Sequence, residues 1–268
     1  MRRIIVGLPG LLPGLLLALL LGGAVLSPVG AVPTPAADPV PVAQQVESVP
    51  ATGALFYPSL LGLGPALGAP HFCTASVVHS ASRDLLVTAA HCVFGTGATI
   101  EFAPLLHDNQ LPGGVWSVTK IYIDPAWTRS FDPRHDVAFL RVAPRAGKKI
   151  EDVVPGRPLA APTASAPVTV SGYPMGSRGR PVTCTAPLAL VDGYPSIGCS
   201  GFTDGTSGGP WVQGPDVVGV IGGLEQGGCA PDVEYSTPFG PGTLALLARA
   251  VANGRGDLVP IGFTANAC

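Results

Sequence analysis

Short apolar runs separated by Gly, Pro, Asn and Asp residues dominate the chain from residue 54 onward. Each run is about as long as a β-strand, and turn-forming residues recur between them at short intervals. Runs of this length and spacing are typical of an all-β sandwich or barrel. The strands predicted in this way are Cys73–Val78, Leu85–Ala89, Val115–Ile123, Val137–Val142, Val168–Ser171, Pro187–Val191 and Val217–Ile221.

One segment near the C-terminus has the pattern of a helix instead. Thr243–Val251 is rich in Leu and Ala, and Asn253-Gly254 would end it. Residues 143–167, rich in Pro and Ala, predict a boundary between two halves. We therefore expect one half at about residues 54–150, the other at about 165–240, and a C-terminal helix and tail at 241–268.

The first 31 residues are organised like a secretory signal peptide. Two arginines precede the apolar run Ile4–Leu26, and small residues follow it. We expect cleavage after Ala31, membrane contact only during export, and a secreted, extracellular protein. The alternative is an uncleaved anchor, because the run is long enough to span a bilayer, although its prolines disfavour a stable helix. Residues 32–53 are predicted to be a flexible, removable leader or short pro-segment.

Composition and charge exclude several classes of protein. The 15 basic and 17 acidic residues leave a net charge of −2, whereas binding to nucleic acid needs clustered basic residues. The 36 glycines and 30 prolines exclude a long-helix or coiled-coil protein. A hydrophobic content of 47% can form a core, which excludes wholesale disorder.

The cysteines agree with an exported protein. Their number is six, an even number, and none forms a close Cys-x-x-Cys pair of the zinc type. His71, Cys73, His91 and Cys92 could form a metal site, but disulfides are the better interpretation in a secreted chain. We therefore predict no metal, with disulfides among Cys73, Cys92, Cys184, Cys199, Cys229 and Cys268.

Gly205-Thr206-Ser207-Gly208-Gly209-Pro210 is the sharpest motif. Glycines on both sides of a serine allow a tight turn that exposes the hydroxyl and points backbone N–H groups at one spot. The pattern Gly-x-Ser-x-Gly also marks the nucleophile of α/β-hydrolases, in which the histidine follows the serine. All five histidines here precede Ser207, so that class is excluded and the order His…Asp…Ser remains.

His91 and Asp136 are the candidates for the other two positions. His91 follows the predicted strand Leu85–Ala89 and precedes a cysteine, which would hold it firmly as a base. Asp136 begins a β-rich apolar run, so its carboxylate would be partly buried and would need a partner such as an imidazole. Asp124 and Asp132 are the rivals, but each precedes a proline and is more typical of a turn.

These motifs resemble those of secreted bacterial chymotrypsin/trypsin-like serine proteases. Thr-Ala-Ala-His-Cys (88–92), Asp-Val-Ala-Phe-Leu (136–140) and Gly-Thr-Ser-Gly-Gly-Pro (205–210) occur in the order of that family. The resemblance implies two packed antiparallel β-barrels with the site in the cleft between them, and a C-terminal helix. It also implies a monomeric endopeptidase that acts on protein or peptide substrates without a cofactor.

By the same resemblance, His91 would act as general base and acid, Asp136 would orient it, and Ser207 would be the nucleophile. The backbone N–H groups of Gly205 and Ser207 would form the oxyanion hole. Two alternatives stay open: a catalytically silent relative that binds a partner, and an esterase on the same fold. In digestive members an Asp precedes the serine and pairs with a new N-terminus, but this chain has Thr206. We therefore expect local hydrogen bonds to hold the oxyanion hole; the alternative is that another acid, Asp204, pairs with the N-terminal ammonium.

The resemblance also implies a bridge Cys73–Cys92 that fixes the histidine loop. Cys184–Cys199 with Cys229–Cys268 is one pairing of the other four cysteines, and a bridge Cys199–Cys229 is the alternative. The family's specificity pocket would lie between Gly201–Thr203 and Ile221–Leu224. Gly201 stands where trypsin has an Asp, and no histidine matches the glutamate-specific relatives, so an apolar or small substrate side chain is preferred.

Overall fold

The computed structural model describes residues 39–57, 64–65, 68–93 and 100–258. All of these belong to one unit, Pro39–Cys268. The predicted signal peptide, most of the C-terminal tail and Cys268 lie outside the described residues. No described helix is long and apolar enough to cross a membrane.

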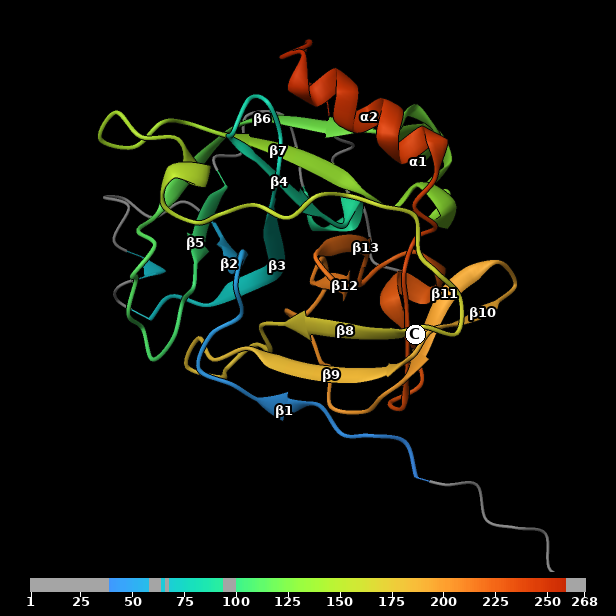
Figure 1. The fold of residues 1–268 in the computed structure, drawn as a ribbon. Helices are drawn as coiled ribbons and strands as arrows, with labels where there is room; N and C mark the ends of the chain where they lie inside the picture. Colours follow the sequence, from blue (N-terminus) through green and yellow to red (C-terminus); the bar gives the residue numbers. More distant parts are fainter. Residues whose placement is uncertain (1–38, 58–63, 66–67, 94–99, 259–268) are drawn as a thin grey trace, which may run out of the picture. The chain divides into compact units, whose positions relative to one another are not determined.

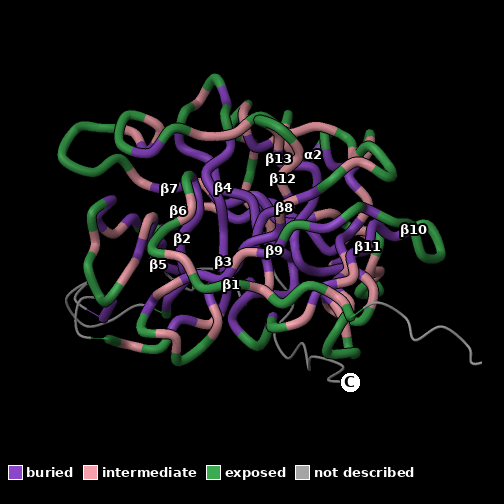
Figure 2. Tube along the Cα trace, turned by 60° about the horizontal axis from the view of Figure 1, so that its bottom comes forward, coloured by how far each residue is buried: buried purple, intermediate pink, exposed green. Residues whose placement is uncertain are grey.

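The first half is a closed antiparallel barrel with the strand order β2-β3-β4-β7-β6-β5. Some of its strands alternate between buried and exposed residues, and others are buried along their whole length. They enclose a core that contains Leu86, Phe102, Trp116 and Phe139. Figure 2 shows the buried residues gathered along these strands. The bounds are β2 Thr52–Phe56, β3 His71–Val78, β4 Leu85–Thr88, β5 Glu101–Pro104, β6 Trp116–Ile123 and β7 Ala138–Val142.

The second half consists of two sheets around a second core that includes Val170, Ile197 and Trp211. Five strands follow the order β1-β9-β8-β12-β13, and three follow the order β10-β11-β14. A bridge between Ile221 and Ser236 joins the two sheets. The bounds are β1 Gln44–Gln45, β8 Pro167–Gly172, β9 Val182–Pro187, β10 Ala189–Val191, β11 Tyr194–Gly198, β12 Pro210–Gln213, β13 Asp216–Val220 and β14 Val233–Tyr235.

In the described ranges, two α-helices and several short 3₁₀ turns complete the fold. The C-terminal helix α2, Pro241–Val251, packs on β6 and β7 of the first half (Figure 1). It begins two residues before the predicted helix because Pro241 occupies its first turn, where the missing N–H has no intrahelical acceptor to lose. The other bounds are α1 Pro125–Ser130, η2 Ala90–Cys92, η3 Pro133–His135, η4 Ile150–Asp152 and η5 Leu224–Gly227.

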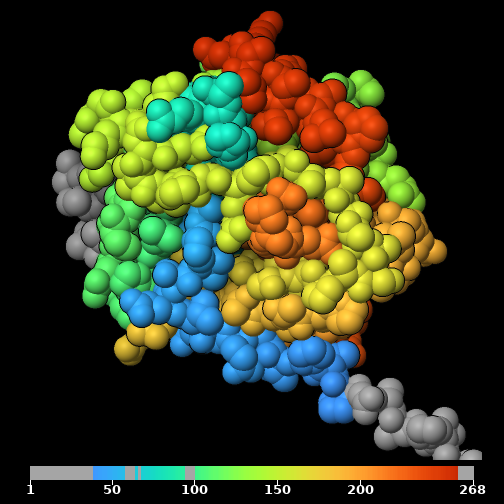
Figure 3. Space-filling view, in the orientation of Figure 1, coloured from blue at the N-terminus to red at the C-terminus, as the bar shows by residue number. Residues whose placement is uncertain are grey.

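The expected all-β class with two barrel-forming halves and one C-terminal helix is confirmed. Part of the predicted leader, however, belongs to the folded structure. β1 pairs with β9, and the Ala43 N–H donates to the Ser200 carbonyl at 2.7 Å. In Figure 3 this N-terminal segment lies along the surface beside the strands of the second half. Strand β2 begins at Thr52, inside the segment predicted to be flexible.

Candidate active site

His91 and Asp136 lie together between the two halves and are both buried. The His91 ring nitrogen Nδ1 is 2.8 Å from Asp136 Oδ2, and the His91 backbone N–H donates to Asp136 Oδ1 at 2.9 Å. A third donor, the Gly223 N–H, lies 2.8 Å from Oδ2. The carboxylate is therefore fully partnered, and it accepts from both the ring and the backbone of one histidine.

The chain places these two side chains at the ends of neighbouring strands. β4 ends at Thr88, and η2 then turns His91 toward the second half. Asp136 closes η3, two residues before the start of β7, which pairs with β4 in the barrel. Gly222 keeps the second half close, because a Cβ there would lie only 2.9 Å from Asp136 Oδ2.

The rival aspartates have structural partners of their own. Asp124 caps α1 by accepting the Ala126 N–H at 2.7 Å. Asp132 caps η3 by accepting the Arg134 N–H at 2.9 Å, and its other oxygen is 3.1 Å from the His135 ring. Neither of them contacts His91. Of the three candidate aspartates, only Asp136 contacts the His91 imidazole.

The remaining histidines are held by other groups. His71 is buried, with Nε2 2.8 Å from the Tyr173 carbonyl, and burial lowers its pKa. His79 contacts Glu151, and His107 lies against the Leu105 carbonyl. None of these described contacts is with Asp136 or Ser207.

Ser207 lies in a tight turn that joins the two halves. Gly205 and Gly208 on either side have φ values of +93° and +78°, which side chains with a Cβ rarely adopt. The Ser207 carbonyl accepts the Thr74 N–H at 2.8 Å. The Thr74 hydroxyl donates to the Gly205 carbonyl at 2.9 Å. Strand β3 of the first half therefore fixes this turn of the second half.

Local bonds also hold the residue before the serine. The buried Thr206 hydroxyl donates to the Thr203 carbonyl at 2.7 Å, and the Thr206 N–H donates to the same oxygen. Within the described part of the chain, the Gly205 and Ser207 N–H groups have no acceptor. Both are thus available to a bound oxygen.

Ser207 and His91 line the same cavity of about 250 Å³, together with Cys73, Cys92 and Gly205. The Ser207 hydroxyl has no hydrogen-bond partner among the described residues. Catalytic hydrogen bonds are often long without substrate, so the open geometry is compatible with a nucleophile–base pair. The structure thus brings His91 and Ser207 to one cavity, with Asp136 buried behind the His91 ring.

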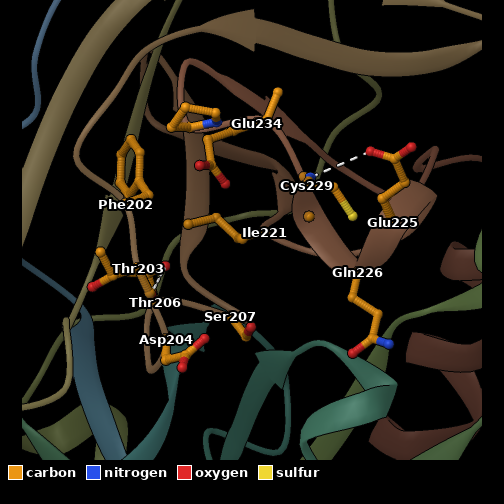
Figure 4. A pocket seen from close by; sticks show the side chains of 14 residues that line it. Phe202, Thr203, Asp204, Thr206, Ser207, Ile221, Glu225, Gln226, Cys229 and Glu234 are labelled. Atoms are coloured by element: carbon orange, nitrogen blue, oxygen red, sulfur yellow. Dashed lines mark hydrogen bonds between the residues drawn. The ribbon is translucent and has the colours of Figure 1, made fainter. Parts of the chain in front are cut away.

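A second cavity of about 510 Å³ opens beside Ser207 (Figure 4). Its lining includes Phe202, Thr203 and Ile221 from the two segments predicted to form the specificity pocket. It also includes Glu234, which sequence reasoning missed. The Val-Glu-Tyr alternation of β14 suggests an outward Glu, whereas the structure buries Glu234 and leaves its two neighbours partly exposed.

Two disulfides join described cysteines to each other, Cys73–Cys92 and Cys184–Cys199. The first fixes the histidine turn to β3, and the second excludes the alternative bridge Cys199–Cys229. The predicted bridge to Cys268 falls outside the described residues. Cys73, His91 and Cys92 are close enough together to suggest a metal site, but both sulfurs are in the disulfide and cannot act as thiolate ligands.

Comparison with known families agrees with this fold. The chain belongs to the trypsin-like peptidase domain family, whose model matches residues 73–220. This range includes the histidine, aspartate and serine motifs. The comparison with curated proteins found no match.

Solved structures share the fold at low sequence identity. The protease Anisep from Arthrobacter nicotinovorans is 22% identical, with a TM-score of 0.66 over 79% of this chain and 100% of that one. The thermostable serine protease AL20 from an extremophilic microorganism is 24% identical, with a TM-score of 0.64 over 76% and 98%. Human heparin binding protein is 17% identical, with a TM-score of 0.59 over 81% and 100%. At these identities the likeness supports the fold alone.

Proposed function

We propose that this chain is a secreted serine endopeptidase that hydrolyses peptide bonds through an acyl-enzyme. The observation that carries the proposal is that His91, held by Asp136, lines the same cavity as Ser207. Asp136 accepts from Nδ1, which leaves Nε2 as the nitrogen that takes the serine proton. A family match alone would not carry the proposal, because proteins of one fold differ in function.

In the first step the Ser207 Oγ attacks the substrate carbonyl carbon, and His91 takes the hydroxyl proton. The carbonyl oxygen becomes an oxyanion and accepts hydrogen bonds from the Gly205 and Ser207 N–H groups. The C–N bond then breaks, and His91 gives its proton to the leaving amine. Water, activated by the same imidazole, hydrolyses the ester and frees Ser207.

Two features support a protein built for export. Cys73–Cys92 and Cys184–Cys199 are typical of an oxidising compartment. The apolar N-terminal run supplies the export signal in this proposal. Sequencing the N-terminus of the protein recovered from the medium tests it, and a start near residue 32 is expected.

A silent binding protein and an esterase are the competing functions. A silent protein would have no use for the buried Asp136 or for the unpartnered N–H groups of the serine turn. An esterase would use the same groups and differ only in the substrates that its pocket admits.

Labelling with a fluorophosphonate, followed by mapping of the adduct, tests the proposal. We expect the adduct on Ser207, no adduct in Ser207→Ala, and cleavage of peptides by the native protein alone. Absence of labelling would support the silent protein. Labelling with ester hydrolysis but no cleavage of any peptide in a diverse library would support the esterase.

A further inference from the structure

Glu234 occupies an unusual position at the cavity beside Ser207. Its side chain comes from β14, opposite Ile197 of β11, and is only 7% exposed. In Figure 4 the carboxyl group points into the space between Phe202 and Ile221, while Ser207 lies at the other end of the cavity. The acid and the nucleophile thus share one pocket.

The Glu234 carboxyl group has no partner among the residues that the structure describes. No hydrogen bond or ion pair in the described part of the chain involves it, and burial is the sole cause of its raised pKa. An unpaired buried carboxylate is costly, so a group that enters the pocket with a positive charge would relieve a cost already present.

The charges around the pocket have one sign. The other ionisable residues that line it are Asp204 and Glu225, both exposed, and no basic residue lines it. Glu225, on η5, accepts the Cys229 N–H at 3.3 Å. On β11, Tyr194 contacts the Arg134 guanidinium 4.6 Å from its ring, and neither residue lines the pocket. Arg134 therefore does not neutralise Glu234 from inside the pocket.

From this geometry we propose that Glu234 determines specificity for substrates with a cationic side chain, Arg or Lys, on the residue before the cleaved bond. The proposal rests on the function proposed for Ser207, because that serine defines which substrate residue enters the pocket. It replaces the expectation of an apolar or small side chain, which followed from Gly201 at the base. The acid, Glu234, comes from β14 and not from the segment that contains Gly201, and its side chain forms part of the pocket lining.

Peptides that differ only at this residue test the proposal: Arg, citrulline, Gln and Leu. Citrulline has the shape of Arg without its charge. At pH 9 we expect kcat/KM for Arg to exceed that for citrulline by about 100-fold, the scale of a buried charge pair. Glu234→Gln should bring the ratio of kcat/KM for the Arg and citrulline peptides close to 1.

Asp232→Asn is the matched control, because it removes the same charge two residues away from an exposed side chain outside the pocket. It should alter the Arg:citrulline ratio by less than about fivefold. Equal cleavage of Arg, citrulline and Gln by the native protein would overturn the proposal and assign Glu234 a neutral, protonated role. Preference for Leu, increased in Glu234→Leu, would also overturn it.

A binding assay separates this proposal from the proposed catalysis. Ser207→Ala protein is titrated with n-butylguanidinium and with neutral n-butylurea, and the experiment is repeated with Glu234→Gln added. We expect only the cation to bind, and at least about tenfold more weakly without Glu234. If fluorophosphonate fails to label Ser207 in the native protein, the proposed function fails while this assay still decides cation binding. If Ser207 is labelled but the cation and the urea bind alike, only the specificity proposal fails.

Discussion

Two regions of the site each bury a carboxyl group, and the two groups have opposite surroundings. Asp136, next to the first barrel, is 0% exposed and receives the His91 ring, the His91 N–H and the Gly223 N–H. Glu234, in the second half, is 7% exposed and receives no donor from the described residues. The two carboxyl groups are therefore similarly buried, but Asp136 accepts hydrogen bonds from three donors and Glu234 accepts none from the described residues.

The difference shows which partner each acid requires. The donors of Asp136 are all part of the chain, so its charge is stabilised before any substrate arrives, and its role is to hold an imidazole. The missing donor of Glu234 must come from outside, or the group keeps its proton. The first region is preorganised for chemistry, and the second is completed by a ligand.

The largest expected effect comes from breaking the partnered acid. Asp136→Asn would place an amide where Oδ2 accepts from the ring, which favours the wrong imidazole tautomer. Turnover should fall about 10⁴-fold if the effect known for triads of this type applies. The rate of peptide cleavage at saturating substrate measures it.

Asp132→Asn is the control for that change, because Asp132 caps η3 and contacts His135 rather than His91. It should alter turnover only slightly. The reverse result, a mild Asp136→Asn and a crippling Asp132→Asn, would move the orienting role to Asp132.

The unpartnered Glu234 should make the free energy of unfolding depend on pH. Burial raises the pKa of Glu234 from 4.5 to about 8 in the folded protein. Between these values the folded state keeps a proton that the unfolded chain loses, so the free energy of unfolding falls as pH rises and levels off above about pH 8. Glu234→Gln removes this loss and should be more stable than the native protein by about 4 kcal/mol at pH 8.

Urea unfolding at pH 5, 7 and 9, with the disulfides intact, measures this difference. The gap between Glu234→Gln and the native protein should widen with pH, whereas Asp232→Asn should follow the native curve. A constant gap would mean that Glu234 has a partner in solution.

Specificity should change with pH for the same reason. With a pKa of about 8, Glu234 is about one-tenth ionised at pH 7 and nine-tenths at pH 9. The ratio of kcat/KM for Arg and citrulline peptides should therefore rise about tenfold over this interval. The ratio cancels every effect of pH that acts on both substrates alike. A ratio that is flat with pH in the native protein, as expected for Glu234→Gln, would contradict the assignment.

The sequence predicted the first region better than the second for a physical reason. The motifs around His91, Asp136 and Ser207 are local, so each can be recognised without knowing the fold. Glu234 has no motif, and the apolar neighbours Val233 and Tyr235 suggest that it faces outward. Only pairing with β11 decides which face of this short strand is buried.

The same distinction applies to the strands. All the apolar runs predicted as strands overlap observed ones, although Pro187–Val191 spans the end of β9 and all of β10. β2 was missed because Thr52-Gly53-Ala54 has little apolar pattern. Its Gly53 is required by close packing, since a Cβ would lie 2.4 Å from the Ala103 carbonyl oxygen. Such a strand is defined by its neighbours and not by its own residues.

The smallest expected effect concerns the N-terminal segment, which borders the Glu234 pocket from outside. Val42 and Ala43 pair with Ser200 and lie against Gly201, directly before Phe202 in the pocket wall. Thr206 carries no charge, and its hydroxyl donates to the Thr203 carbonyl, so it cannot form an ion pair with a new N-terminus. Proteins that start anywhere up to residue 39 should therefore be equally active.

A start at Ser48 removes β1 and should cost about 1 kcal/mol of stability. It should also raise KM for the Arg peptide, with fluorophosphonate labelling retained. Activity confined to one start would instead show that a free N-terminal ammonium organises the oxyanion hole.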